Sequence, residues 1–166
     1  MVENDENFDA EFEKTDSGAA LAVPISISDV KKGTHIVMDG RPCKVMEITT
    51  SKTGKHGHAK ANIMAIDIFN GKKYNDVCPV SHSKECPTIK RTEYTIMNVD
   101  DDEYVSLIDK AGNMRQDLKL PNETDDDKET TKRIRTGIEA GKTMMCTVLG
   151  ALNFEKIEEA KESTEN

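Results

Sequence analysis

Lysine and histidine side chains gather in one short stretch, Ser51–Lys60, with the sequence Ser-Lys-Thr-Gly-Lys-His-Gly-His-Ala-Lys. Two glycines, Gly54 and Gly57, bracket Lys55 and His56, and glycine lets the backbone adopt conformations that a Cβ atom would oppose. The stretch contains no large apolar side chain that would bury it. It therefore presents lysine amines, which bind phosphates and accept covalent modification. The alternative interpretation is a solvated surface loop without function.

The dipeptide Gly54-Lys55 matches part of the phosphate-binding loop of nucleotide-hydrolysing enzymes, but the rest of that motif is missing. The motif needs a glycine where Thr49 stands and a serine or threonine where His56 stands. The residues that follow favour a strand, so no helix N-terminus is available to bind a phosphate. A catalytic lysine also requires burial to lower its pKa, which a polar stretch does not supply. No serine, histidine and acid form a triad either, so the sequence predicts no catalytic residues and no enzyme.

Two other groups of residues are candidates for binding a metal ion. His56 and His58 form a pair, and Cys78, His82 and Cys86 are separated by three residues each. Zinc sites normally combine closer cysteine pairs with a second pair of ligands. Free, partly buried thiols are therefore the favoured interpretation, and the sequence predicts no metal site and no bound cofactor.

Charge is unevenly distributed along the 166 residues, whose net charge is −8. Residues 1–22 contain seven acids and one base, and residues 88–166 contain eighteen acids and twelve bases. Residues 23–87, which include the lysine-rich stretch, contain six acids and ten bases. A cationic middle segment in an acidic chain predicts an anionic partner for one part of the molecule only.

The sequence shows no membrane span or secretion signal. No run is long and apolar enough to span a bilayer, and Met1–Asp16 is acidic, unlike a signal or transit peptide. The four cysteines, Cys43, Cys78, Cys86 and Cys146, are widely spaced. We interpret them as free thiols in a reducing compartment, and we expect a cytoplasmic location.

The elements around the basic stretch are predicted to be strands. Apolar and β-branched residues fill 43–50 before it and 59–69 after it, which predicts a long hairpin with Lys55 at its tip. Asp39-Gly40-Arg41-Pro42 and Asn70-Gly71 supply the neighbouring turns. Short strands with tight turns and little helix predict a small barrel or sandwich.

Two further stretches mark the limits of the predicted domains. Residues 1–20 contain too little apolar surface to offset the cost of ordering, which predicts a disordered acidic tail. Residues 78–87 carry two prolines and several polar side chains that interrupt the strand pattern. We expect a domain boundary there, giving domains at residues 21–87 and 88–166.

The second half of the chain predicts more strands and one helix. We expect strands at 89–99, 104–108, 114–120 and 143–149, and one or two final helical turns at 154–161. The helix is expected over 122–139, with Asn122 or Thr124 as its N-cap and with Ile134 and Ile138 on one face. A few strands with one helix inserted late favour an OB-type barrel.

The stretch Ser51–Lys60 also resembles, without a gap, the hypusine loop of the eukaryotic translation initiation factor 5A family. Further stretches resemble the family: Gly40–Lys44, Asp67–Phe69, Cys78-Pro79, Ile89–Arg91 and Asp117–Pro121. The similarity covers about residues 20–152. It implies a mainly β protein with an N-terminal SH3-like barrel, then a C-terminal OB-fold barrel with one inserted helix.

The resemblance implies that Lys55 is converted to hypusine. Deoxyhypusine synthase would transfer an aminobutyl group from spermidine, and deoxyhypusine hydroxylase would add the hydroxyl. The rest of the loop is implied to contact the ribosome and tRNA: Lys52, Thr53, Gly54, His56, Gly57, His58, Ala59 and Lys60.

The family's function is implied as well. The factor binds the ribosome near the exit site, so its partners are ribosomal RNA and peptidyl-tRNA besides the two modifying enzymes. It promotes peptide-bond formation at difficult sequences such as proline runs, and it aids termination. A weak homodimer is compatible with the resemblance.

The main alternative is a general single-stranded RNA-binding module that uses its OB-like domain without hypusine. Such a module would stack bases on aromatic side chains. Aromatic residues make up only 4% of the chain, and Tyr94 and Tyr104 are the obvious candidates. A third class, a metal-dependent enzyme built on the cysteines and histidines, is less favoured still.

Overall fold

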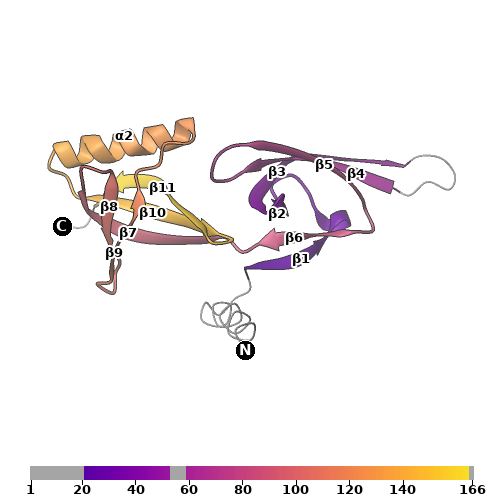
Figure 1. Ribbon diagram of the computed structural model, residues 1–166, viewed down its shortest axis with the longest axis horizontal. Helices are drawn as coiled ribbons and strands as arrows, with labels where there is room; N and C mark the ends of the chain where they lie inside the picture. The colour runs from indigo at the N-terminus through magenta and orange to yellow at the C-terminus, as the bar shows by residue number, and fades with distance from the viewer. Residues whose placement is uncertain (1–20, 53–58, 165–166) are drawn as a thin grey trace, which may run out of the picture. The chain divides into compact units, whose positions relative to one another are not determined.

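The computed structural model describes residues 21–52 and 59–164. By their contacts these residues form two compact units. The first comprises the chain up to Ile68 together with Lys72–Thr88, and the second comprises Phe69–Gly71 and the chain from Ile89 onward (Figure 1). The acidic tail predicted at residues 1–20 lies outside the described residues.

The first unit contains a four-stranded antiparallel sheet and a two-stranded ribbon. The sheet has the order β2-β3-β4-β5, formed by His35–Met38, Arg41–Lys52, Ala59–Asp67 and Lys73–Pro79. The ribbon pairs β1, Ala22–Ser26, with β6, Ser83–Pro87, and the short 3-10 helix η1, Ile27–Asp29, follows β1. The turns predicted at Asp39-Gly40 and Asn70-Gly71 are confirmed, since Asp39, Gly40 and Gly71 adopt positive φ angles of 53°, 75° and 76° between paired strands.

Alternation along β3 and β4 builds the core of the first unit. Cys43, Val45 and Ile63 are fully buried, whereas Lys44 and Asn62, which lie next to them in sequence, are exposed. Successive side chains of a strand point to opposite faces, so one face of the sheet is apolar and the other is open to solvent.

One charged pair stabilises the same core at its edge. The Asp67 carboxylate is buried and accepts a hydrogen bond of 2.5 Å from Nε of Arg41. Burial, together with the nearby Asp67 carboxylate, raises the pKa of the Cys43 thiol to about 11. Cys43 is therefore a neutral core residue at physiological pH.

The interruption of strands expected at residues 78–87 is wrong, because β6 occupies half of that stretch. Pro79 and Pro87 are the last residues of β5 and β6. Proline has no backbone N–H and cannot donate a hydrogen bond to the ladder. At the end of a strand this removes a bond only at the edge of the ladder, so the cost in stability is small. The polar side chains are tolerated because β6 lies in a ribbon where residues such as Glu85 remain exposed.

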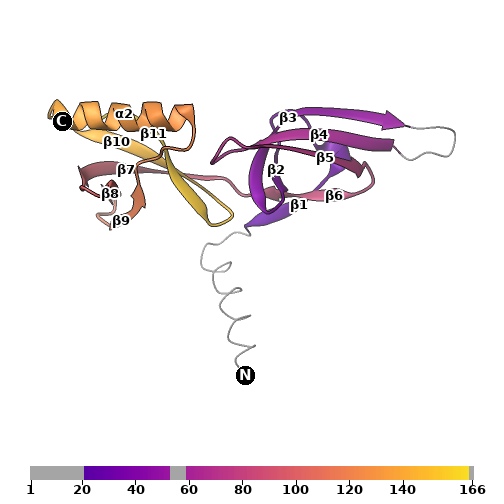
Figure 2. The same ribbon diagram turned by 45° about the horizontal axis from the view of Figure 1, so that its top comes forward.

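The second unit is a five-stranded antiparallel sheet with one α-helix among the described residues (Figure 2). The sheet has the order β11-β10-β7-β8-β9. Its elements are β7 (Lys90–Val99), β8 (Tyr104–Ile108), β9 (Met114–Lys119), α2 (Asp125–Glu139), β10 (Met144–Ala151) and β11 (Phe154–Glu162). Its core includes Val105, Leu107, Ile134, Val148 and Ile157.

Helix α2 begins with a capping box formed by Thr124 and Asp127. Oγ1 of Thr124 accepts from the Asp127 N–H at 3.0 Å, and Oδ2 of Asp127 accepts from the Thr124 N–H at 3.1 Å. This reciprocal arrangement satisfies two amides that the helix itself leaves unbonded. Of the two predicted caps, Thr124 is therefore the one that the structure uses, and Asn122 is not.

The buried face of α2 differs from the prediction. Ile134 is buried as expected, but Ile138 is 39% exposed. The neighbouring Gly137 is buried instead, and a Cβ atom there would lie only 2.2 Å from Sδ of Met144. The helix thus approaches β10 through a glycine, which an apolar-spacing argument does not detect.

The helical turns predicted at residues 154–161 are wrong, because these residues form strand β11. Leu152 and Asn153 have φ angles of 50° and 71° and turn the chain back onto β10. The register shifts within the β10–β11 ladder, and the buried residues Ile157 and Ala160 consequently lie three apart. A β-bulge therefore produced the spacing that resembled a helix.

Candidate functional site

The basic stretch lies at the end of the longest hairpin among the described residues. β3 and β4 pair from Cys43 opposite Asp67 to Lys52 opposite Ala59, and Figure 1 shows them side by side up to these ends. The pairing confirms the predicted hairpin. It also brings together the two residues that flank the segment containing Lys55.

The structure describes three of the predicted loop residues. Lys52 is the last residue of β3 and is exposed, Ala59 begins β4 and is half-buried, and Lys60 follows it and is exposed. The remaining predicted residues lie outside the described residues: Thr53, Gly54, Lys55, His56, Gly57 and His58.

The base of the hairpin is held firmly on the β4 side. The carbonyl of Ala59 accepts a hydrogen bond of 3.1 Å from the Val80 N–H, and Lys60 pairs with Pro79 of β5 as well as with Ser51 of β3. β4 is therefore bonded to neighbours on both edges from its first residue. The segment containing Lys55 emerges from a fixed base.

The charge around this base is positive. The sequence from Ile48 to Ile66 contains three lysines and two histidines but no aspartate or glutamate. Neither Lys52 nor Lys60 forms an ion pair within the part of the chain that the structure describes. Their charges are available to an anionic partner.

The cysteines do not assemble a metal site among the described residues. All four are free thiols, as predicted, and no three His, Cys, Asp or Glu side chains of the described ranges lie close enough to hold a metal ion. Burial raises the pKa of the Cys146 thiol to about 12. The His56 and His58 pair lies outside the described residues.

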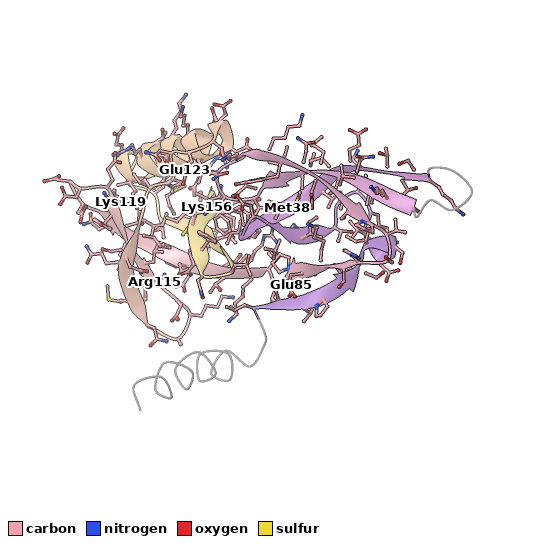
Figure 3. All side chains as sticks on the ribbon, turned by 45° about the vertical axis from the view of Figure 1, so that its right-hand side comes forward. Met38, Glu85, Arg115, Lys119, Glu123 and Lys156 are labelled. Atoms are coloured by element: carbon pink, nitrogen blue, oxygen red, sulfur yellow. The ribbon has the colours of Figure 1, made fainter. Side chains whose placement is uncertain are left out.

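The two tyrosines suggested as stacking platforms are already in contact with cations of the chain. The guanidinium carbon of Arg115 lies 5.9 Å from the centroid of the Tyr94 ring, which packs against the core. Nζ of Lys119 lies 5.0 Å from the Tyr104 ring centroid. Figure 3 labels both cations, which come from β9. These contacts disfavour base stacking on either ring.

Comparisons with known proteins identify the family. Residues 21–82 match the family model described as "Translation initiation factor 5A-like, N-terminal", and residues 88–161 match "Eukaryotic elongation factor 5A hypusine, DNA-binding OB fold". The eukaryotic translation initiation factor 5A of Spodoptera exigua is 42% identical over 156 residues, which cover 94% of this chain and 94% of that protein. The chain belongs to the translation initiation factor 5A family. This is a family of translation factors and not of enzymes.

Solved structures of the translation initiation factor 5A family show the same fold. A family protein from Naegleria fowleri is 47% identical with a TM-score of 0.78, covering 86% of this chain and 99% of that one. The factor from Methanococcus jannaschii is 26% identical with a TM-score of 0.64, covering 85% and 96%. The predicted mainly β fold, with an N-terminal β domain and a C-terminal OB fold that contains one helix, is confirmed.

Strand pairing places further lysines on the same sheet face as Lys60, and the sequence analysis did not identify them. Lys44 of β3 and Lys73 of β5 both lie opposite Ile66 of β4. They are exposed on the same face of the sheet as Lys60. Only the register shows this, because the three lysines are far apart in sequence.

Within the described ranges, no helix combines the length and the apolar character that a bilayer crossing requires.

Proposed function

We propose that this chain is a hypusine-modified translation factor, with Lys55 as the modified residue. It binds the ribosome near the exit site, promotes peptide-bond formation at sequences such as proline runs, and aids termination. The pairing of Lys52 with Ala59 carries this proposal. It brackets Lys55 within a short connection whose sequence matches the hypusine loop.

The hairpin also gives a reason for modifying one lysine among three. Lys52 and Lys60 belong to paired strands. Drawing either backbone into an enzyme's active site would break ladder hydrogen bonds, each of which contributes about 0.5–1.5 kcal/mol. In the sequence, Lys55 lies between Lys52 and Ala59, which form the last pair of the ladder that the structure describes. Deoxyhypusine synthase and deoxyhypusine hydroxylase would therefore act on Lys55 without unzipping β3 from β4.

The modification would suit a task of reach and position. Lysine carries one compact charge on a four-carbon stem. An aminobutyl group from spermidine lengthens that stem and adds a second amine, and the hydroxyl adds a hydrogen-bond donor and acceptor. The extended side chain would hold the acceptor end of peptidyl-tRNA in a geometry that lets a poor nucleophile such as proline attack. The reaction itself belongs to the ribosome.

The charge distribution supports RNA as the partner of the first unit. Ribosomal RNA and tRNA are polyanions, and residues 23–87 carry ten bases against six acids. We therefore propose ribosomal RNA and peptidyl-tRNA as partners and the cytoplasm as the site of action.

Peptide mass spectrometry of the protein purified from its own cells tests this proposal. We expect the hydroxylated aminobutyl group on Lys55 alone, and an unmodified lysine in protein made in a bacterial host that lacks the two enzymes. A group located on Lys52 or Lys60, or no group at all, would contradict the proposal.

A further inference from the structure

Three lysines from three adjacent strands share the outward face of the first unit's sheet. Lys44 of β3 and Lys73 of β5 lie opposite Ile66, and Lys60 lies further along β4 on the same side. All three are exposed, and none of them forms an ion pair with a carboxylate that the structure describes. We call Lys44, Lys60 and Lys73 the lysine face. Its charge is open to an acidic segment that reaches it.

The lysine face also has an apolar element. A shallow hollow of about 230 Å³ lies between the rows of its lysines, and Met64 and Val77 contribute to its lining. Val77 is 58% exposed, more than any other large apolar side chain that the structure describes in the first unit. A cavity of about 150 Å³ holds a benzene ring, so the hollow has room for one aromatic side chain.

The hollow is lined by two acids as well. Asp76 is paired with Lys84 at 2.6 Å, whereas Glu47 is exposed and has no cation partner among the described residues. The three lysines therefore outnumber the unpaired acid. A ligand that suits this surface combines several negative charges with an apolar anchor.

The N-terminal segment of the same chain has this composition. Residues 1–16 contain seven acids and one base, and they precede the described part of the chain. Phe8 and Phe12 lie among these acids and are two of only four phenylalanines in the sequence. Aromatic side chains gain much from burial, so acids alone do not account for the character of this segment.

The segment is long enough to reach the lysine face. The chain is anchored where the Leu21 carbonyl accepts a hydrogen bond from the Thr88 N–H. β1 follows and pairs with β6, which packs against β2, the neighbour of β3. Residues 14–20 span up to about 23 Å at about 3.3 Å per residue, whereas stacked sheets lie only about 10 Å apart. Phe12 can therefore pass the β2 edge and reach the side of Lys44.

The second unit is a less suitable target for the acidic segment. Many of its cations already have carboxylate partners: Arg91, Arg115, Arg135, Lys142, Lys156 and Lys161. An acidic segment would have to displace these partners there, whereas the lysine face has none to displace among the described residues.

We propose that the acidic segment of residues 1–16 binds the lysine face of its own chain, with Phe8 or Phe12 in the hollow beside Val77. The segment then shields the three lysines, and a polyanion that binds them must first displace it. The tether favours this occupant over an acidic segment of another protein, because a short flexible linker gives an effective concentration on the order of millimolar. Modification of Lys55 plays no part in this contact, so the inference and the proposed function can fail separately.

Carbodiimide cross-linking of the full chain, which joins carboxylates directly to amines, tests the contact. Mass spectrometry of the cross-linked monomer should show acids of residues 1–16 joined to Lys44, Lys60 or Lys73 in preference to Lys31 and Lys32, two exposed lysines of the same unit. The preference should be lost in about 1 M potassium chloride, where the Debye length is about 3 Å. Cross-links spread evenly over the lysines, or found only between two chains, would overturn the inference.

Binding of inorganic polyphosphate to full-length variants tests the displacement. Phe8→Ala combined with Phe12→Ala keeps every charge, so simple repulsion by the acids predicts no change. If the segment occupies the face about nine-tenths of the time, this variant should bind polyphosphate up to about tenfold more tightly. Met97→Ala combined with Met114→Ala, which removes two exposed apolar side chains of the second unit, should bind as wild type does. Unchanged affinity in the phenylalanine variant would also overturn the inference.

Discussion

Arg115 of β9 donates two parallel hydrogen bonds, each 2.9 Å long, to the Glu155 carboxylate of β11. β9 and β11 are the two outermost strands in the order β11-β10-β7-β8-β9. The pair therefore links the sheet's edges and closes the OB fold. The same guanidinium bonds Asp117 at 2.7 Å and lies over the Tyr94 ring, so one side chain ties together β7, β9 and β11.

We predict that Arg115→Gln destabilises the second unit by about 1–3 kcal/mol, the range for hydrogen bonds to charged groups. Native-state hydrogen exchange at the amides of β9 and β11 measures this locally. Lys142→Gln is a suitable control because the Lys142–Glu162 pair is about half exposed on both sides, at 51% and 56%. Its loss should cost less than about 1 kcal/mol. Equal effects of the two variants would contradict the closing role of Arg115.

The Arg115–Asp117 contact predicts a pH dependence. Hydrogen bonds from Arg115 lower the pKa of the Asp117 carboxyl. Because the folded pKa lies below the unfolded value of about 3.9, this contribution is fully present above about pH 4 and is lost as the pH falls through the folded pKa. Asp117 is 61% exposed, so the effect is small. Carboxyl titration followed by nuclear magnetic resonance should give a pKa below 3.9 in wild type, which Arg115→Gln should raise.

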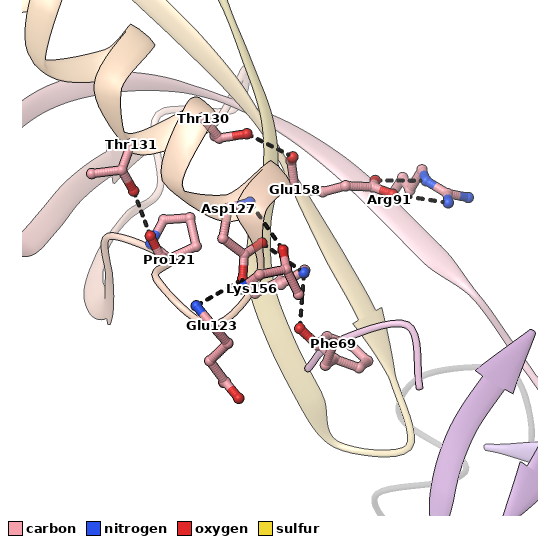
Figure 4. Close-up of polar contacts among 10 residues, drawn as sticks. Phe69, Arg91, Pro121, Glu123, Asp127, Thr130, Thr131, Lys156 and Glu158 are labelled. Atoms are coloured by element: carbon pink, nitrogen blue, oxygen red, sulfur yellow. Dashed lines mark hydrogen bonds and ion pairs between the residues drawn. The ribbon is translucent and has the colours of Figure 1, made fainter. Parts of the chain in front are cut away.

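A buried ion pair at the start of α2 predicts a larger loss of stability when one of its two partners is removed. Nζ of Lys156 donates to Oδ1 of Asp127 at 2.8 Å and to the carbonyl of Phe69 at 3.0 Å (Figure 4). The Asp127 side chain is only 3% exposed. Lys156→Met would leave the Asp127 carboxylate buried without a cation, which is expected to destabilise the second unit by about 3–5 kcal/mol.

Urea unfolding of the second unit, followed by the exchange of α2 amides, measures the cost of Lys156→Met. Combining it with Asp127→Asn should recover part of the loss, because the amide still accepts hydrogen bonds at the helix start but carries no charge. A double variant less stable than Lys156→Met alone would show that charge burial is not the cause.

The thiols should differ in reactivity. Burial raises the pKa of Cys43 to about 11 and that of Cys146 to about 12, while Cys78 and Cys86 are only half-buried. Since the thiolate is the nucleophile, iodoacetamide at pH 8 should label Cys86 in the folded protein. It should label Cys78 more slowly, because burial raises the pKa of that thiol, and it should leave the other two unmodified. Rapid labelling of Cys146 without denaturant would contradict the core that we describe.

The sequence predicted those elements whose signals are local. Asp39-Gly40 and Asn70-Gly71 marked turns that the structure confirms, and alternation marked β3, β4 and β8 closely. Local signals failed where tertiary context decides. The bulge in the β10–β11 ladder gave β11 a helical spacing, and Gly137 took the buried position expected for Ile138.

The same distinction between local sequence signals and tertiary context applies to the candidate site. Lys55 could be singled out from the glycines, lysines and histidines around it, because that signal is contiguous in sequence. Lys44 and Lys73 could not, since they reach the face of Lys60 only through strand pairing. Register depends on turns, bulges and the whole hydrophobic pattern, so residues brought together by it need a structure.

Synthesis through a proline run in a reconstituted translation system tests the central claim most directly. Modified wild type is compared with Lys55→Arg and with the control Lys110→Arg, which makes the same exchange at an exposed lysine between β8 and β9. Arginine keeps the charge but lacks the primary amine that accepts the aminobutyl group, and its guanidinium differs in shape. We predict that Lys110→Arg relieves stalling as wild type does, whereas Lys55→Arg does not, with stability changed by less than about 0.5 kcal/mol in both. Relief of stalling by Lys55→Arg at the wild-type rate would contradict the hypusine-dependent function.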